Sequence, residues 1–570
     1  MKILKKCMPV LVALILIFVI SIIYIVPQLY EKYSYSDEEY DLNEYFQIFT
    51  KDDVPIILQT EVLEDNAKQK YDTFYLAYDT VKNYFTNRFY VNEEEKIICF
   101  TLPDQVVKAE IGEEVNVYYK GEEQIASPYP IAFYEGESLY IAIDYVKMFT
   151  NFSYEVFENP TRMQVYTEWT TMKAAKVTKN SKVRYRGGVK SEVLTPVTEG
   201  DQVFILEEYE DWDQVQTMDG FIGYLEKKVL GEAYEYEQTP VHDAIEMDYS
   251  GKRVEGKVNL AFHQVFVECT GKLLREDMTN SKSVNVVAPT WFRPTDAYGN
   301  FQSLANADYV STAHEMGLQV WAVFTDVDEV SKDVDEYTLF SSSLCRQALI
   351  SNLVDKVLEF GVDGINIDFE NIDSATAPHF VQFLRELSIE TRKNGLILSV
   401  DNYVPTASTS FYNRKEQGIV CDYVVIMGYD EHWSGASEAG SVASIEYVTN
   451  GIADTVNSVP AKKVINAIPF YTRIWCTNGA EVSSETVGMQ MANDWVAARS
   501  ITPVWDEVTC QNYATYEIDG KVYEVWLEDA ESIAVKLNVM NQQGIAGVAA
   551  WKLGMETDDV WDTIAGYMNQ

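Results

Sequence analysis

Residues that bind metals or form cross-links are scarce in this chain of 570 residues. It has seven cysteines and five histidines, with no CxxC pair and no HExxH spacing. A metal enzyme is therefore not indicated, and no metal or cofactor is expected. The cysteines are too sparse for a disulfide framework. Cys476 and Cys510 lie in one segment and could form a bridge, but buried free thiols are expected.

Basic residues are also in the minority. The chain has 45 lysines and arginines against 88 aspartates and glutamates, a formal net charge of -43. Nucleic acid is therefore excluded as a partner, because no basic face can neutralise phosphates. With 47% apolar and 13% aromatic residues, the chain can build sizeable cores, and its length leaves room for about three or four domains.

One long apolar run, Cys7–Val26, follows lysines at positions 2, 5 and 6. Twenty helical residues span about 30 Å, the thickness of a bilayer core. Residues 1–27 are therefore predicted to be an uncleaved membrane anchor, with the lysines inside and the rest of the chain outside the cell. A cleavable signal has a shorter apolar core and a small-residue cleavage site, whereas Ser21–Val26 stays bulky. Secretion after signal cleavage remains the alternative.

The next two segments carry no catalytic pattern. Residues 28–50 are acidic, rich in tyrosine and without apolar periodicity, which predicts a solvated stalk. Within residues 51–168, Tyr75–Lys82 aligns with Tyr140–Lys147, and each copy is followed by an alternating segment. This predicts an α+β domain in which a short helix on a hairpin is used twice. It resembles the N-terminal domain of copper amine oxidases, and we interpret it as a spacer or binding module.

Residues 172–232 consist of short alternating runs separated by turns. Gly200-Asp201 marks one turn and Asp219-Gly220 a tight hairpin, with a strand at Trp212–Val215 between them. The segment resembles bacterial SH3-like domains, which attach hydrolases to cell-wall polymer. A small structural barrel without a ligand is an equally open interpretation.

From about residue 255, apolar strands alternate with amphipathic helices. Residues 250–570 are therefore predicted to form an α/β fold, a (β/α)8 TIM barrel with a small α+β insertion within Cys476–Gln543. Helices are expected from Ser341–Ser343 to Gly361 and over Thr376–Asn394. The eight strands are expected to begin near Val258, Val284, Leu318, Gly364, Leu396, Tyr423, Val464 and Ile545.

The predicted fourth strand carries acidic side chains. In DGINIDFE, Asp363–Glu370, strand alternation directs Asn366, Asp368 and Glu370 to one face and apolar residues to the other. Burying neighbouring carboxylates costs several kcal/mol unless they are paired or share a proton. The spacing suits chemistry in which one carboxyl is ionised while its neighbour donates a proton. A loop with scattered acids is the alternative, but Gly361 and the alternating isoleucines argue against it.

Further polar and aromatic residues fall where barrel strands end, and chemistry in such barrels lies at that face. Taken singly, each could be a core tyrosine, a rim ion pair or a packing tryptophan. Together they indicate a site. They are Glu370 on strand four, Met427, Tyr429 and Asp430 on strand six, Tyr471 and Arg473 on strand seven, and Trp551 on strand eight.

Over residues 250–570 the chain resembles family-18 glycoside hydrolases. The family motif D-G-x-D-x-D-x-E is matched at Asp363, Gly364, Asp368 and Glu370, MxYD at Met427, Tyr429 and Asp430, and the strand-eight tryptophan at Trp551. With the SH3-like segment and the anchor, the chain resembles bacterial members that act on cell-wall or spore-cortex glycan.

The resemblance implies substrate-assisted retention. Glu370 would protonate the glycosidic oxygen, Asp368 would hold the substrate's acetamido N–H, and Tyr429 would orient the acetamido oxygen. Asp363 and Asn366 would support them. Contacts to the sugar are expected from Met427, Asp430, Trp551, Tyr471, Arg473 and Trp291.

One position departs from the family motif. The middle aspartate is Asn366 here, which can neither hold a negative charge nor shuttle a proton. We expect its amide to donate to Asp368 and to keep that carboxylate ionised. Members resembling spore-lytic glucosaminidases carry Asn at this place. The expected consequence is therefore a changed rate and pH optimum, with activity retained.

These observations predict a membrane-tethered N-acetylglucosaminidase. Its expected partners are an N-acetylated polysaccharide (peptidoglycan or chitin-like) and, through the N-terminal helix, the cell membrane. A chitinase remains an alternative. So does a non-catalytic glycan-binding barrel, or a surface protein whose N-terminal modules carry the function.

Overall fold

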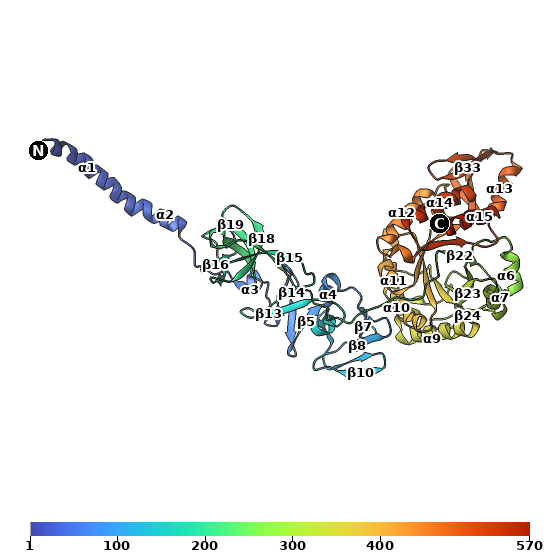
Figure 1. Cartoon of the computed structure of the whole chain (residues 1–570), viewed down its shortest axis with the longest axis horizontal. Helices are drawn as coiled ribbons and strands as arrows, with labels where there is room; N and C mark the ends of the chain where they lie inside the picture. Colours follow the sequence, from blue (N-terminus) through green and yellow to red (C-terminus); the bar gives the residue numbers. More distant parts are fainter. Residues whose placement is uncertain (1) are drawn as a thin grey trace. The chain divides into compact units, whose positions relative to one another are not determined.

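The computed structural model describes residues 2–570, with side chains from residue 8 onward. It contains two compact units, coloured along the chain in Figure 1. The first comprises the chain up to residue 246, apart from residues 90–95 and 99–107. The second comprises those two segments and residues 247–570.

The chain begins with a long helical segment. Helix α1 (Lys2–Ile20) passes through a π-helical turn, η1 (Ser21–Ile25), into α2 (Val26–Tyr33). The helix therefore continues past Pro27. In a regular α-helix the ring of Pro27 would clash with the carbonyl of Ile23, four residues earlier. Ile23 lies in the wider π-helical turn, which relieves this clash. Among the described residues, Met8–Tyr33 is the one helix long and apolar enough to cross a membrane.

The acidic segment after α2 packs on the domain that follows the repeats. The backbone N–H of Tyr40 donates to the carbonyl of Val193 (3.0 Å), and that of Val193 donates to the carbonyl of Glu38 (2.8 Å). Phe46 is fully buried in the apolar core of the same domain. The predicted solvated stalk is therefore wrong for residues 38–46, because their aromatic side chains complete this core.

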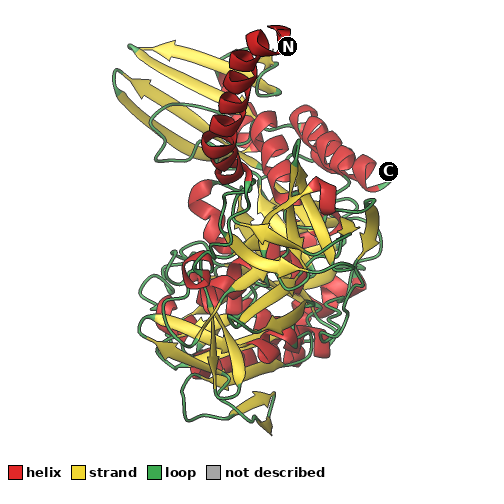
Figure 2. Cartoon of the chain, turned by 90° about the vertical axis from the view of Figure 1, so that its left-hand side faces the viewer, coloured by secondary structure: helices red, strands yellow, loops and turns green. Residues whose placement is uncertain are grey.

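Residues 171–237 form a seven-stranded antiparallel sheet of order β17-β16-β20-β19-β18-β15-β21. Strands make up most of this segment. Figure 2 colours the chain by secondary structure, with strands in yellow. The turns expected at Gly200-Asp201 and Asp219-Gly220 separate consecutive strands. Assignment to the SH3-like class stays a prediction. The elements are β15 (Thr171–Lys176), β16 (Ser181–Arg184), β17 (Val193–Val197), β18 (Gln202–Glu208), β19 (Trp212–Thr217), β20 (Ile222–Glu226), η2 (Lys227–Val229) and β21 (Tyr234–Glu237).

The two sequence repeats form equivalent elements. In each copy a hairpin leads into a short helix, and strands β5 and β12 of the two copies pair antiparallel, with Leu76 opposite Ile141. The elements are β4 (Ala67–Lys70), β5 (Thr73–Ala77) and α4 (Tyr78–Tyr84), then β11 (Ala132–Glu135), β12 (Ser138–Ala142) and α5 (Ile143–Lys147). The other elements before residue 171 are α3 (Leu42–Tyr45), β1 (Asp53–Val54), β2 (Ile56–Leu58), β3 (Glu61–Val62), β6 (Tyr90–Asn92), β7 (Ile97–Thr101), β8 (Val106–Glu110), β9 (Val117–Lys120), β10 (Glu123–Ala126), β13 (Ser153–Phe157) and β14 (Arg162–Tyr166).

Eight parallel strands of the second unit close into a barrel, because β22 pairs with both β35 and β23. This confirms the predicted (β/α)8 fold, and each strand begins within two residues of its expected position. The barrel strands are β22 (Val258–His263), β23 (Val286–Pro294), β25 (Gln319–Thr325), β26 (Gly364–Asp368), β27 (Ile397–Tyr403), β28 (Tyr423–Met427), β29 (Val464–Pro469) and β35 (Gly547–Trp551). A short strand, β24 (Phe301–Ser303), pairs with β23.

Helices cover the outside of the barrel. Ser342 caps α9 by accepting the N–H of Cys345, and the helix ends at Gly361 with φ 67°, a left-handed conformation that favours glycine. The helical elements are α6 (Gly271–Asp277), α7 (Ala307–Glu315), α8 (Glu336–Ser341), α9 (Ser343–Phe360), α10 (Ala377–Lys393), η3 (Ala407–Tyr412), α11 (Arg414–Val420), α12 (Ile445–Val456), η4 (Ala461–Lys463), α14 (Ala530–Gln543) and α15 (Asp559–Met568).

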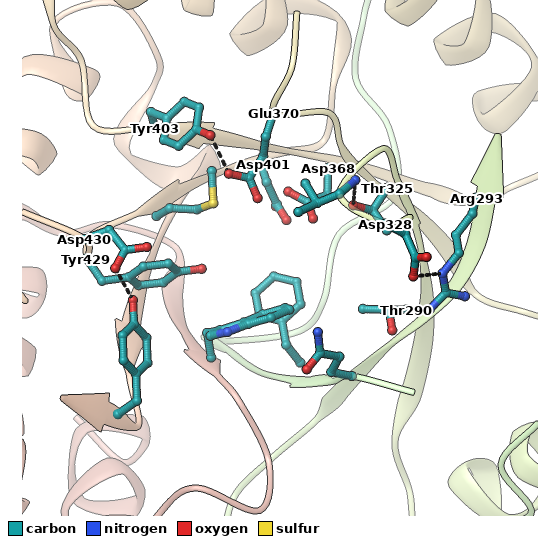
Figure 3. Close-up of a pocket in the computed structure, with 16 residues that line it drawn as sticks. Thr290, Arg293, Thr325, Asp328, Asp368, Glu370, Asp401, Tyr403, Tyr429 and Asp430 are labelled. Atoms are coloured by element: carbon teal, nitrogen blue, oxygen red, sulfur yellow. Dashed lines mark hydrogen bonds and ion pairs between the residues drawn. The ribbon is translucent and has the colours of Figure 1, made fainter. Parts of the chain in front are cut away.

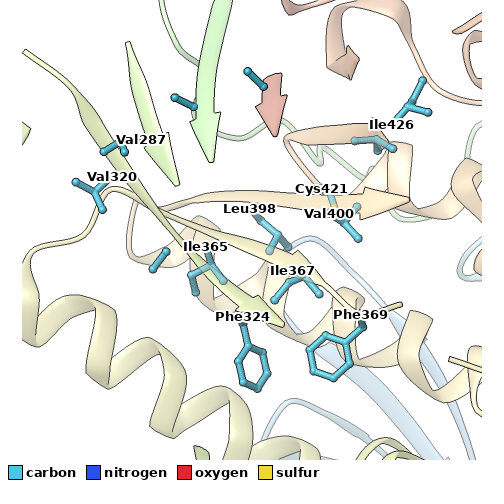
Figure 4. Packing of buried hydrophobic residues seen from close by; sticks show 14 of the residues in the cluster. Val287, Val320, Phe324, Ile365, Ile367, Phe369, Leu398, Val400, Cys421 and Ile426 are labelled. Carbon is cyan, nitrogen blue, oxygen red and sulfur yellow. The ribbon is translucent and has the colours of Figure 1, made fainter. Parts of the chain in front are cut away.

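Strand alternation separates the core from the site. Ile365 and Ile367 point outward and are fully buried in the apolar layer beneath the helices, with Leu398 and Val400 of the neighbouring strand (Figure 4). Each such side chain contributes roughly 1.5–3 kcal/mol of burial. The intervening residues of the same strands therefore face the barrel interior.

An insertion between β29 and α14 forms a second small sheet. Its five strands are antiparallel in the order β31-β30-β34-β33-β32. It spans residues 471–527, so the C-terminal part of the predicted insertion is barrel helix α14. Cys476 and Cys510 are free and partly exposed. The elements are β30 (Tyr471–Asn478), β31 (Glu481–Gly488), α13 (Met489–Ala498), β32 (Val504–Asp506), β33 (Gln511–Ile518) and β34 (Lys521–Leu527).

Candidate active site

A pocket opens at the carboxyl ends of the barrel strands (Figure 3). It encloses about 800 Å³, its open mouth included. Residues from all eight barrel strands, or from the segments directly after them, converge there. They are Phe262, Gln264, Thr290, Arg293, Thr325, Val327, Asp328, Asp368, Glu370, Asp401, Tyr403, Met427, Tyr429, Asp430, Tyr471 and Trp551.

Strand β26 supplies the two acids that the motif predicted. Asp368 is the last residue of the strand and is buried, and Glu370 follows two residues later. The carboxylate of Asp326 accepts the backbone N–H groups of Glu370 and Asn371, each at 2.8 Å, and so holds the turn after the strand. The Tyr403 hydroxyl donates to Glu370 Oε2 at 2.5 Å. Glu370 is thus positioned through both its backbone and its side chain.

Asp368 and Glu370 retain their protons more strongly than free carboxyls do. Burial raises the pKa of Asp368 well above its ordinary value, and the charges of Glu370, Asp401 and Asp326 raise it further. Burial also raises the pKa of Glu370, although the bond from Tyr403 opposes this. A carboxyl that is still protonated at neutral pH can donate a proton to a leaving group.

Asn366 does not contact the partner expected for it. It is fully buried, and its Nδ2 donates to Asp401 Oδ1 at 2.8 Å and to Ser399 Oγ at 3.0 Å. The predicted donation to Asp368 is therefore wrong. Ser399 lies directly opposite Asn366 in the parallel register, so strand β27 offers nearer acceptors.

Aromatic and acidic residues from β28, β30 and β35 form the opposite wall. Tyr429 and Tyr471 meet edge to face with ring centroids 6.0 Å apart, and the Tyr471 hydroxyl donates to Asp430 Oδ1 at 2.7 Å. Burial raises the pKa of Tyr429 well above its ordinary value, so its hydroxyl stays a hydrogen-bond donor. Met427 and Trp551 also line the pocket, as predicted.

Two further predicted site residues, Asp363 and Arg473, do not line the pocket. Asp363, at the opposite end of β26, accepts the N–H of Val320 at 2.9 Å. Arg473 Nη1 donates to Ser484 Oγ.

Trp291 is fully buried and packs edge to face on Tyr309, with ring centroids 5.0 Å apart. Trp291 belongs with Tyr309 of α7 to the apolar cluster beneath the helices, whereas its neighbour Thr290 lines the pocket. The expected contact between Trp291 and a sugar is therefore wrong.

Two residues of β27 that line the pocket were not predicted from the sequence. Asp401 and Tyr403 follow Ser399 at alternate positions, separated by residues of the opposite face. The same two-residue alternation had identified DGINIDFE one strand earlier, so the signal was present. The ion pair between Arg293 Nε and Asp328 Oδ2, at 2.6 Å, was also missed, because Arg293 lies on β23 and Asp328 in the loop after β25.

A parallel barrel with neighbouring carboxyls and aromatic walls at its carboxyl face is the architecture of many glycosidases. Residues 275–556 match the family model "Glycosyl hydrolases family 18". The barrel of this chain therefore belongs to glycosyl hydrolase family 18.

Relatives and solved structures agree with this assignment. The cortical fragment-lytic enzyme of Bacillus anthracis is 26% identical over 251 residues, which are 42% of this chain and 57% of that protein. Glycosylase YvbX of Bacillus subtilis (strain 168) is 26% identical over 266 residues, 44% of this chain and 76% of that protein. The chain thus spans little more than half the length of some relatives it matches.

The crystal structure of the Bacillus cereus spore cortex-lytic enzyme SleL superposes with a TM-score of 0.50 at 21% identity, covering 55% of this chain and 74% of that one. At this identity the likeness concerns the fold.

Proposed function

We propose that this chain is a retaining glycoside hydrolase that cleaves β-linked, N-acetylglucosamine-containing glycan by substrate-assisted catalysis. One observation carries the proposal: Asp368 and Glu370 lie side by side in a pocket that also contains Tyr429 and Trp551. The raised pKa of Glu370 suits a proton donor, and the family of the barrel supports the same chemistry.

In the proposed first step, Glu370 donates its proton to the glycosidic oxygen. The substrate's acetamido oxygen attacks the anomeric carbon and forms an oxazolinium ion, while Asp368 accepts the acetamido N–H. Tyr429 donates to the acetamido oxygen and aims it. Glu370 then takes a proton from the water that opens the intermediate, which restores the original configuration.

Two effects would provide most of the acceleration. A well-aligned internal nucleophile is equivalent to a concentration of about 10⁵–10⁸ M. General acid catalysis adds roughly 10²–10⁴-fold. Trp551, tilted on Phe262 at 5.6 Å between ring centroids, offers an apolar surface on which a sugar can stack.

We further propose peptidoglycan or spore cortex as the substrate, reached from the outer face of a membrane that the N-terminal helix spans. The support is the apolar helix Met8–Tyr33 and the relatives that are named cortical fragment-lytic enzymes. Recovery of the full chain in the membrane fraction with its N-terminus intact is the expected result. A soluble chain that begins after residue 26 would show that the helix is a removed signal.

The activity is tested by incubating the full chain with purified sacculi and, separately, with chitin oligomers, and measuring released reducing ends. Glu370→Gln should abolish release, whereas Glu359→Gln, the same change on the exposed face of α9, should not. Faster turnover of chitin oligomers than of sacculi would identify a chitinase. Tight oligomer binding without turnover would identify a glycan-binding barrel.

A further inference from the structure

The carboxyl that the family motif lacks at position 366 has a counterpart on the next strand. Asn366 is opposite Ser399 and Ile367 is opposite Val400, so the parallel register places Asp401 beside Asp368. Neighbouring strands lie about 4.8 Å apart. Asp401 is only 4% exposed, yet it lines the pocket. Figure 3 shows the carboxyl groups of Asp368, Glu370 and Asp401 along one wall.

The side-chain amide of Asn366 is bonded to two residues of the neighbouring strand β27. Both hydrogens of its amide are used, one by Asp401 and one by Ser399. It therefore has none left to donate to Asp368, and it cannot titrate. Asp401 is consequently the titratable group that is bonded to the middle position of the motif and level with Asp368.

We propose that Asp401 performs the role of the missing carboxyl: it shares one proton with Asp368 and holds that proton while Asp368 is ionised against the substrate's acetamido group. This rests on the proposed function. Before substrate binds, the proton resides on either acid. When the acetamido N–H reaches Asp368, the proton resides on Asp401, and it is shared again after product leaves. The number of bound protons is unchanged throughout.

The surroundings favour such sharing. Burial raises the pKa of Asp401 to about 8, the charge of Glu370 raises it as well, and the bond from Asn366 opposes them. Close acids in one buried site titrate as a unit. Arg293, the only cation among the lining residues, is paired with Asp328. The titratable groups coupled to this pair are Asp326, Glu370, Tyr403 and Tyr429.

The first test is the pH profile of Asp401→Asn. This variant keeps an acceptor for Asn366 but cannot take up a proton, so the proton on Asp368 must leave to solvent before the acetamido group binds. We expect kcat/KM of the variant to fall about tenfold for each pH unit below the pKa of Asp368, so the acidic limb of its profile moves to higher pH. In alkali, kcat/KM of the variant should approach that of wild type. A profile parallel to that of wild type would overturn the proposal.

The decisive variant exchanges the two groups. In Asn366→Asp with Asp401→Asn, the carboxyl returns to β26 and the amide moves to β27. We expect the wild-type acidic limb to return. Ser399→Ala is the matched control, because it removes the other bond to Asn366 without touching a titratable group. It should lower Tm and leave the shape of the profile unchanged. A folded exchange variant no better than Asp401→Asn would contradict the proposal.

A second measurement does not depend on turnover. In the Glu370→Gln background, the infrared C=O band of a protonated carboxyl should persist when a chitin oligomer binds, because Asp401 keeps the proton; with Asp401→Asn added, the band is carried by Asp368 and should be lost on binding. Loss of the band on binding to the Glu370→Gln variant would overturn the inference even if the wild type is active. An inactive wild type together with a persisting band would instead count against the proposed function.

Discussion

The two ends of strand β26 carry the same kind of residue in very different surroundings. At its start, the Asp363 carboxylate accepts the backbone N–H of Val320 and lies 2.8 Å from His314 Nε2. At its end, Asp368 has other acids as neighbours and faces a pocket. The motif therefore contains a residue that stabilises the sheet at one end and the candidate catalytic residues at the other.

The contrast arises because the two ends of the strand differ in the hydrogen-bond donors that lie near the carboxylate. Asp363 lies where β25 and β27 begin, so backbone amides are at hand: its own carbonyl also accepts the N–H of Ile397. Asp368 lies where the strands end and four acids converge, so burial and like charge raise its pKa. Identical carboxyls thus stabilise a sheet or hold a proton according to which end of the barrel they occupy.

The strongest test of the contrast is Glu370→Gln at the pocket end. We expect kcat to fall by about 10²–10⁴-fold, because the amide cannot donate a proton to the leaving oxygen. Tm should hold or rise, since the change removes a partly buried acid from a group of acids. Activity and thermal unfolding of the full chain are the measurements. Retained turnover would assign the proton donor to another residue.

Tyr403→Phe should have a smaller effect on the same acid. The Tyr403 hydroxyl stabilises the ionised form of Glu370 and so lowers its pKa; without that bond the pKa rises further. The protonated form then persists to higher pH, and the alkaline limb of kcat/KM moves upward. Tyr513→Phe removes a comparable bond to Glu524 in the insertion and is the control. An alkaline limb that stays in place or moves downward would contradict this assignment.

At the other end, Asp363→Ala should affect stability and leave chemistry alone. It leaves the N–H of the fully buried Val320 without its side-chain acceptor, which costs about 1–3 kcal/mol. We expect a lower free energy of unfolding in urea. We expect kcat to stay within about twofold of wild type, because Asp363 lies at the opposite end of the strand from the pocket and does not contact its residues. A large loss of kcat at unchanged stability would erase the distinction between the two ends.

Much of this arrangement could be predicted from the chain alone, because alternation and turn residues act locally. The strand starts, the α9 terminus at Gly361 and the inward placement of Asp368 and Glu370 follow from those rules. Partners across strands do not, since register is a tertiary property. Asn366 therefore received the wrong partner, and Asp401 was not recognised although its strand shows the same alternation.

Trp291 illustrates the same limit at a place where the register shifts. Strand β23 is irregular between Thr290 and Phe292, and all nine of its residues are buried, so burial does not reveal which way each one faces. The Trp291 indole N–H has no hydrogen-bond partner among the described residues.

The smallest expected effect follows from that position. Trp291→Phe leaves a small cavity but also removes a buried donor without a partner, and these oppose each other, so stability should fall by about 1 kcal/mol or less. KM for the glycan should not change, whereas a sugar contact would raise it several-fold. The measurement is the initial rate as a function of substrate concentration. Trp551→Phe is the comparison and should raise KM, because Trp551 lines the pocket whereas Trp291 lies in the core.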